Sequence, residues 1–339
     1  MPRIHLFNPE NDLALADNHA NYTPPAAALK LRRGGALLPM LWADDSDAIL
    51  VPDTSCMEEA DRLRALFGLR GSPVTHSPAG FVPDPWGWSE YTASAFRRAG
   101  VDTSLLPGAA TLSTLRNLSH RRITVAIHHC LGTDPSLIPV EAKSVEELSE
   151  AVARFGADAV VKLPWSSSGR GVILTGSMDR ENLWRICAGS IRRQGSVMIE
   201  PRFDRIADFA MLFHCSEGIA RFEGLSAFAT DSRGAYLGNI IASQERIASR
   251  IDAGISDFEQ PLSDALTRLV APHYSGWCGI DMLTYRTPSG SKEIAPCIEL
   301  NLRRTMGVAA LCAASRMPLS SSSEKILSVS PRGILITDP

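Results

Sequence analysis

The chain has 339 residues, with 34 Lys and Arg against 37 Asp and Glu and a formal net charge of -3. Hydrophobic residues make up 45% and charged residues 21%, a composition typical of globular proteins that excludes wholesale disorder. The near-neutral balance argues against a protein held to nucleic acid or to a membrane surface by net charge, because such proteins carry a large basic excess.

The first residues lack the apolar segment of a signal peptide, and no apolar run approaches the roughly 18 residues that cross a bilayer. The seven cysteines form no Cys-x-x-Cys pair, so neither a disulfide framework nor a structural zinc site is indicated. We therefore expect a cytoplasmic protein without nucleic-acid or membrane partners.

The first third of the chain is predicted to be a loop-rich α/β domain, because Pro and Gly separate short apolar segments. Its expected elements are strands at residues 4–7 and 48–52, a helix at residues 89–99, and a strand beginning at Leu105 and Leu106.

The middle of the chain has clearer signals. Ser144 and Glu147 form a capping box for a helix that Gly156 ends. The elements expected next are strands at residues 159–163 and 171–175, a helix at residues 179–193, a strand at residues 197–200, hairpins turning near residues 216–218 and 288–290, and a last strand at residues 333–337.

A lysine in an apolar strand gives the first candidate site. Lys162 ends that strand, where burying an ammonium is costly unless an anion pairs with it. Residues 166–171 are rich in Ser and Gly, which lets backbone N–H groups approach phosphate oxygens. The alternative is a hairpin loop beside a lysine that reaches solvent, and this segment alone does not separate the two.

The two common mononucleotide motifs do not account for this loop. A Walker loop needs a Gly-Lys pair that opens a helix, and the chain contains no such pair. A dinucleotide fingerprint also opens a helix, whereas Gly169-Arg170-Gly171 runs into the apolar residues 172–174. The pattern favours a glycine loop between two antiparallel strands.

An acidic hairpin gives the second candidate site. If its turn centres on Gly290, Asp281 and Glu299 are equidistant from the turn, so the two carboxylates face each other. Asn301 and Arg303 share the face of Glu299, because strand side chains alternate. A bulge at the prolines of the hairpin would shift this register.

Two facing carboxylates repel each other unless one keeps a proton or a cation lies between them. Oxygen ligands from Asp281, Glu299 and Asn301 suit Mg²⁺ or Mn²⁺. The alternative is a solvated hairpin whose acids pair with Arg303 and Arg304. The metal site is favoured, because apolar neighbours indicate that one face of the hairpin is packed and the polar face borders a cleft.

Together these segments resemble the ATP-grasp superfamily over roughly residues 113–312. Glu299-Leu300-Asn301-Leu302-Arg303 is similar to the E-x-N-x-R run of biotin carboxylases and related carboxylate ligases. The other matching segments are the lysine and flexible phosphate loop (Lys162 and residues 166–171), the hinge strand between two subdomains (residues 198–201) and the metal-binding acid (Asp281).

The resemblance implies an α/β (α+β) fold class. An N-terminal α/β domain of the pre-ATP-grasp type would be followed by a two-subdomain ATP-grasp fold with antiparallel sheets. The implied domains are residues 1–112, a small subdomain with the phosphate loop at residues 113–195, and a large subdomain with the metal site and a C-terminal tail at residues 196–339.

The resemblance also implies roles for single residues. Those that would hold ATP are Lys162, Ser167, Ser168, Gly169, Arg170, Glu200 and Asp208. Those that would hold Mg²⁺ or Mn²⁺ are Asp281, Glu299 and Asn301, and those that would assist phosphoryl transfer are Arg303 and Lys162. Outside the family pattern, Glu200 is typical of a strand-end acid, and Asp208 of a partner for Arg205.

Two positions depart from relatives or stay open. D-alanine–D-alanine ligases have an arginine two residues before the metal-binding acid, where this chain has Gly279. Arg303, and after it Arg304, is therefore the expected donor to an acyl phosphate. The early basic residue on the α-phosphate is Arg121 or Arg122, and the sequence does not choose between them.

The function implied is that of an ATP- and Mg²⁺-dependent ligase, which activates a carboxylate as an acyl phosphate for attack by an amine. Its substrates would be small molecules or a peptide. An ATP-grasp kinase, a thiol ligase and a non-catalytic nucleotide-binding regulator are the alternatives. A homodimer is expected from family analogy alone.

The segment Asn8-Pro9-Glu10-Asn11-Asp12 follows a strand and would border the acceptor site, although such residues more often form turns and helix caps. His19, Asn21 and Tyr22 are weaker candidates for the same site. The neighbours His128 and His129 have no acidic partner nearby in sequence, and we expect a core or surface role for them.

Overall fold

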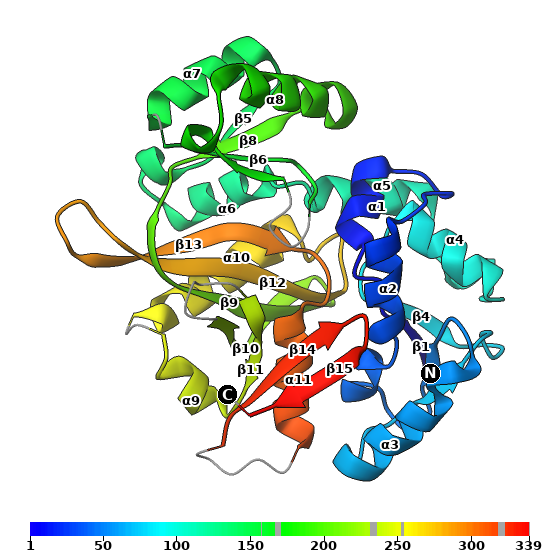
Figure 1. Ribbon diagram of the computed structural model, residues 1–339. Coiled ribbons are helices and arrows are strands. Elements are labelled where there is room, and N and C mark those ends of the chain that lie inside the picture. The colour runs from blue at the N-terminus through cyan, green and yellow to red at the C-terminus, as the bar shows by residue number, and fades with distance from the viewer. Residues whose placement is uncertain (157, 167–170, 231–235, 252–253, 318–322, 339) are drawn as a thin grey trace.

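The computed structural model describes residues 1–156, 158–166, 171–230, 236–251, 254–317 and 323–338. These residues form one parallel and two antiparallel sheets, which confirms the predicted fold class. In Figure 1 the small antiparallel sheet and its helices lie at the top, the N-terminal parallel sheet at the right, and the large antiparallel sheet between them and below.

The N-terminal sheet has the strand order β3-β2-β1-β4, with parallel pairing. The strands are β1 (Arg3–Leu6), β2 (Ala48–Leu50), β3 (Ser72–Val74) and β4 (Val82–Pro85). The helices of this region are α1 (Asn11–Asp17), α2 (Ala26–Gly34), α3 (Met57–Phe67) and α4 (Glu90–Arg98), with short 3₁₀ turns η1 (Leu38–Leu41) and η2 (Thr54–Cys56). The first two strands and α4 were predicted, and Ser89 caps α4 by accepting from the Thr92 amide.

The strand predicted at Leu105 and Leu106 is wrong. Residues Thr103–Leu105 form the 3₁₀ turn η3, because the Asp102 carboxylate accepts the Ser104 amide at 2.9 Å and bends the chain. The helices α5 (Ala109–Leu118) and α6 (Ile123–Leu131) follow.

The small antiparallel sheet has the order β5-β8-β6-β7. Its strands are β5 (Val140–Ala142), β6 (Val160–Lys162), β7 (Val172–Leu174) and β8 (Val197–Glu200), covered by α7 (Val145–Phe155) and α8 (Arg180–Gln194), with turns η4 (Pro135–Leu137) and η5 (Thr175–Ser177). The predicted helices and strands of this region are confirmed. The Ser144 hydroxyl accepts the Glu147 amide, while the Glu147 carboxylate accepts the amide of Lys143 instead of that of Ser144.

The large sheet has seven strands in the order β13-β12-β9-β10-β11-β14-β15. They are β9 (Asp204–Ser216), β10 (Ile219–Thr230), β11 (Tyr236–Ile241), β12 (Gly276–Arg286), β13 (Lys292–Asn301), β14 (Lys325–Ser330) and β15 (Gly333–Thr337). The remaining helices are α9 (Gln244–Ala248), α10 (Glu259–Leu269) and α11 (Met306–Arg316), with the turn η6 (Ile255–Phe258). Both predicted hairpins and the last strand are present. Among the described helices, none has the length and apolar content to cross a membrane.

The acidic hairpin has the predicted register. Asp281 on β12 lies directly opposite Glu299 on β13. The register shifts after Asp281, so that Leu283 pairs with Ala295, and Pro296 lies in the bulged stretch. Between the turn and the bulge the pairs are centred on residue 289 and not on Gly290, so without the bulge Asp281 would face Cys297. The shift at the bulge brings Glu299 opposite Asp281.

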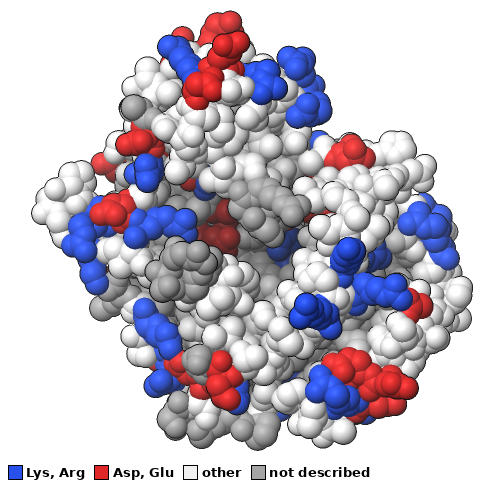
Figure 2. Space-filling model, in the orientation of Figure 1, with Lys and Arg blue, Asp and Glu red and all other residues white. Residues whose placement is uncertain are grey.

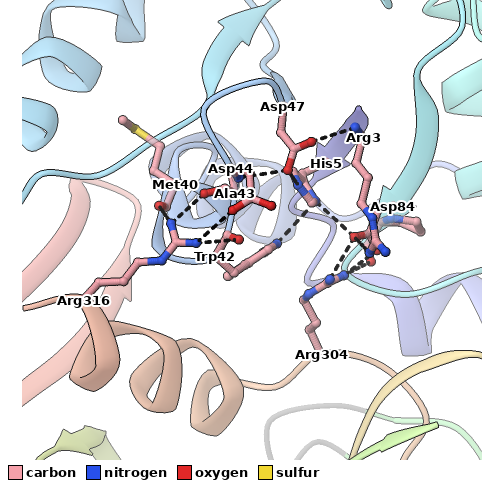
Figure 3. Close-up of polar contacts among 11 residues, drawn as sticks. Arg3, His5, Met40, Trp42, Ala43, Asp44, Asp47, Asp84, Arg304 and Arg316 are labelled. Atoms are coloured by element: carbon pink, nitrogen blue, oxygen red, sulfur yellow. Dashed lines mark hydrogen bonds and ion pairs between the residues drawn. The ribbon is translucent and has the colours of Figure 1, made fainter. Parts of the chain in front are cut away.

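A buried chain of ionic contacts joins the N-terminal sheet to the end of β13 (Figure 3). The Arg304 guanidinium donates to both carboxylate oxygens of Asp84, at 2.6 and 2.9 Å. The His5 ring lies 3.2 Å from Asp84 through Nδ1 and 3.1 Å from Asp47 through Nε2. Burial opposes ionisation of Asp84, but Arg304 and His5 outweigh it and hold the pKa of this carboxyl well below its usual range. These contacts fix the strand ends of the parallel sheet beside the acidic hairpin.

We predict that Asp84→Asn lowers the free energy of unfolding by about 3 kcal/mol or more, because removing one partner of a buried ion pair leaves the other charge uncompensated. Arg3→Gln is the control, since Arg3 makes an exposed pair with the same carboxylate, with 56% of its side chain accessible. That exposed pair is expected to contribute less than about 1 kcal/mol. Chemical denaturation of both variants measures the difference, and equal losses would contradict the assigned role of Arg304.

Candidate active site

A cavity of about 1240 Å³ lies where the three sheets meet. Its walls include the strand ends of the N-terminal sheet, the inner strands of the small sheet, and β9, β12 and β13 of the large sheet. Figure 2 shows a central hollow on this face, with acidic side chains inside it. Pockets for one small ligand typically measure about 300–1,000 Å³, so this cavity has room for more than one such ligand.

The acidic wall of the cavity is formed by Asp281, Glu299 and Asn301. The Asn301 amide donates to Asp281 Oδ2 at 3.1 Å. Burial and the charge of Glu299 raise the pKa of Asp281 to about 7. Glu299 is equally enclosed, but the Arg121 guanidinium outweighs its burial and holds the pKa of Glu299 below its usual range.

These three side chains fit a hard divalent cation by their chemistry. They supply carboxylate and amide oxygens, the donors that Mg²⁺ prefers, and the proton affinity of Asp281 marks a place where positive charge is missing. The set has only two acids, and among the described residues no group of three or more His, Cys, Asp or Glu side chains is arranged for a metal. A cation here would need further ligands from outside the protein, as Mg²⁺ commonly obtains from phosphates and water.

Arg121 connects the acidic wall to the small sheet. Its Nη2 donates to Glu299 Oε1 at 2.8 Å, and its Nη1 donates to Ser166 Oγ at 2.7 Å and to the Leu163 carbonyl. Arg122 instead points to Glu141 at 3.5 Å, with 43% of its side chain exposed. Of the two arginines that the sequence left open, the structure therefore brings Arg121 to the cavity.

Lys162 and Glu200 form an ion pair on the opposite wall. Lys162 Nζ lies 2.5 Å from Glu200 Oε1, and both side chains are more than nine-tenths buried. The resemblance assigned them to different parts of a nucleotide, and the geometry adds that each neutralises the charge of the other. Ser166 is described and buried, whereas Ser167, Ser168, Gly169 and Arg170 lie outside the described residues.

Asp208 lines the cavity from β9, the strand next to Asp281. It pairs with Arg205, which the sequence predicts when the family resemblance is left aside. Its side chain is 30% exposed, so it remains accessible from the cavity.

Arg303 lines the cavity and makes a fork-like ion pair with Asp12 of α1. Its Nη2 lies 2.7 Å from Asp12 Oδ2, and its Nε lies 3.2 Å from Oδ1. Arg304 turns away to Asp84. The alternative in which the hairpin acids pair with these two arginines is therefore wrong, because both arginines bind acids of the N-terminal region instead.

The sequence missed Asp12 as the partner of Arg303, although it singled out the segment that contains it. The rest of this segment has structural roles, as expected for turn residues. Asn8 donates to the Gly87 carbonyl at 2.9 Å, and Glu10 pairs with Arg32 at 3.0 Å. No local signal connects Asp12 to a residue 291 positions away.

His128 is a core residue, as predicted. Its Nε2 lies 2.9 Å from the Cys297 carbonyl, and burial lowers its pKa to about 4. It therefore stays neutral at physiological pH and takes no part in the charged cavity.

No family model matches the chain. The formate-dependent phosphoribosylglycinamide formyltransferase of Burkholderia mallei (strain SAVP1) is 34% identical over 152 residues, which are 44% of this chain and 35% of that protein. The match thus spans about a third of the length of the curated relative.

Solved structures also align with the chain. N5-carboxyaminoimidazole synthetase from Staphylococcus aureus aligns with a TM-score of 0.49 and 9% identity, over 99% of this chain and 80% of that one. Biotin carboxylase from Campylobacter jejuni aligns with a TM-score of 0.49 and 12% identity, over 96% and 75%. The resemblance to the ATP-grasp superfamily, which is carried by the sequence motifs, stays a prediction.

We predict that Asp281→Asn stabilises the protein in the absence of nucleotide and metal. The pKa of Asp281 is 3.8 in the unfolded chain and about 7 in the folded protein. Ionisation of this carboxyl therefore lowers the free energy of unfolding as the pH rises from 3.8 to about 7, and the full loss persists above pH 7. The variant should therefore gain about 1–3 kcal/mol at pH 8, and less at pH 5.

Thermal unfolding in EDTA at pH 5 and pH 8 measures this gain. Asp257→Asn is the matched control, because Asp257 is exposed, and it should show no such pH-dependent gain. A loss of stability at pH 8 for Asp281→Asn would contradict the conclusion that the ionised Asp281 carboxylate destabilises the folded protein.

Proposed function

We propose that this protein is an ATP- and Mg²⁺-dependent carboxylate–amine ligase. One observation carries the proposal. The opposed acids Asp281 and Glu299 face the same cavity as the cationic side chains of Arg121, Lys162 and Arg303. Phosphoryl transfer needs positioning and charge neutralisation more than covalent chemistry from the protein, and this cavity offers both signs of charge at close quarters.

In the proposed reaction a carboxylate oxygen attacks the γ-phosphorus of ATP and ADP leaves. An amine then attacks the acyl carbon, and phosphate leaves as the amine loses a proton. Lys162 and Arg121 would neutralise phosphate oxygens, and Arg303 would stabilise the transferring phosphoryl group. Glu200 and Asp208 would face the nucleoside, and residues 167–170 would close over the triphosphate.

Asp281, Glu299 and Asn301 would hold Mg²⁺ or Mn²⁺, and the metal would supply positive charge that offsets the charge of the phosphates. Arg121 would then have a second task. Since it neutralises Glu299 without metal, it would keep this acid ionised and in place for the cation.

The names of the similar proteins include a formyltransferase that depends on formate, a synthetase and a carboxylase, each of which points to small-molecule substrates. We propose small molecules for this chain as well, with a peptide, a thiol acceptor or a kinase reaction as alternatives at the same nucleotide site. The division at residues 112 and 195, a homodimer and a cytoplasmic location stay predictions. The seven free cysteines fit a reducing compartment.

We predict that ATP with Mg²⁺ raises the thermal stability of the wild type more than ATP with EDTA or GTP with Mg²⁺. A ligand at a hundredfold excess over its Kd contributes about 2.7 kcal/mol. Glu299→Gln should lose the metal-dependent part, because it keeps an acceptor for Arg121 but lacks the charge. Glu293→Gln, an exposed acid on the same strand, is the matched control.

Turnover is measured with a panel of carboxylic acids and hydroxylamine, which converts any acyl phosphate into a hydroxamate. We expect hydroxamate from the wild type and from Glu293→Gln, and about 10²–10³-fold less from Glu299→Gln. ATP consumption with a phosphorylated product and no hydroxamate would favour a kinase. Nucleotide protection without turnover on any acid would favour a regulator.

A further inference from the structure

One end of the cavity is apolar. It lies against the N-terminal region and the C-terminal hairpin, and its wall is formed by Phe7, Pro9, Leu31, Trp86, Met306 and Val329. Phe7 and Trp86 follow the carboxyl ends of the parallel strands β1 and β4, where ligands of parallel sheets commonly bind. Their rings meet edge to face at 5.0 Å, so this part of the wall is rigid.

Leu31 lacks the packing that its neighbours have. Phe7 and Trp86 belong to a buried hydrophobic cluster, and Met306 and Val329 pack against it. Leu31 belongs to none of the clusters formed by the described residues, although it lines the same cavity. None of the nine described residues of α2 is fully buried. The helix packs against β14 and β15, and its Leu31 side chain lines the cavity beside them.

Arg303 and Thr305 line the cavity on the chain segment that leads into this apolar wall. The Arg304 amide donates to the Trp86 carbonyl at 2.9 Å, and a Cβ on Gly87 would lie 3.1 Å from Arg303 Cβ. The guanidinium-bearing segment and the aromatic wall are therefore direct neighbours. A ligand with a carboxylate at Arg303 would extend its remaining atoms along apolar side chains.

We propose that this end of the cavity binds the carboxylate substrate, and that this substrate is a monocarboxylic acid with an aliphatic or aromatic substituent. The inference rests on the proposed ligase function and adds the substrate class. The substituent packs on Leu31, Trp86 and Val329, which line this end of the cavity. A second acid or other charge on the substituent would be buried there without a partner, which is costly.

The test uses binding, so that it does not depend on turnover. Wild-type protein is saturated with Mg²⁺ and a non-hydrolysable ATP analogue and titrated by calorimetry with acetate, hexanoate, 3-phenylpropionate and glutarate. We expect 3-phenylpropionate and hexanoate to bind at least about tenfold more tightly than acetate and glutarate. Equal or tighter binding of acetate or glutarate overturns the proposal.

A pair of variants on one helix assigns the subsite. Leu31→Asn should weaken 3-phenylpropionate binding about tenfold, whereas Leu29→Asn should leave it within about twofold, because Leu29 is 43% exposed and does not line the cavity. Equal effects of the two substitutions overturn the subsite. Nucleotide affinity is measured in each variant. Absent nucleotide binding in the wild type would refute the proposed ligase, whereas nucleotide binding with a preference for polar acids would refute this inference alone.

Discussion

The pairing of buried charges between separate parts of the chain is the constraint on which this structure depends. Arg121 bridges the small sheet and the acidic hairpin through Glu299, and Arg303 bridges the hairpin and α1 through Asp12. Burying any one of these charges alone would cost much free energy. Pairing offsets that cost only when the small sheet, the acidic hairpin and α1 have the relative positions seen in the structure. The same contacts that compensate the charges therefore set the shape of the cavity.

The consecutive residues Arg303 and Arg304 show how a short segment serves two purposes. Arg304 joins the chain of contacts through Asp84 and His5, which anchors the parallel sheet. Arg303 binds Asp12 at the cavity wall. Arg304 thereby stabilises the fold. Arg303 lines the cavity and is oriented by Asp12, a partner that an anionic ligand can replace.

Much of the site could be predicted from sequence because its signals are local. The opposition of Asp281 and Glu299 was predicted from a turn centred on Gly290. The strands next to the turn pair about residue 289, and the bulge beside Pro296 restores the opposition. The strands on either side of the loop after Lys162 follow from apolar runs bounded by small residues. Such patterns need only the period of a strand and the chemistry of a turn.

The rest of the site could not be predicted, because it depends on contacts between residues far apart in the chain. Nothing near Asp12 indicates that it binds Arg303, and nothing near Arg121 indicates that it reaches Glu299 while Arg122 points to Glu141. The turn at Leu105 was missed for a different reason. The Asp102 carboxylate accepts the amide and the hydroxyl of Ser104, and the Asp102 carbonyl accepts the Leu105 amide, so the chain turns where a strand was predicted.

The ion pairs that line the cavity bear on how a ligand would enter it. Lys162 already has an anion in Glu200, Arg121 has one in Glu299, and Arg303 has one in Asp12. An incoming phosphate or carboxylate therefore exchanges partners with an existing acid and does not have to strip water from a bare cation. A divalent cation arriving with the phosphates compensates the acids that this exchange releases. Asp281 forms no ion pair with a described residue, and its raised pKa marks the position in the cavity that is short of positive charge. On this view, anion and metal enter most favourably together, because each removes the unpaired charge that the other would create.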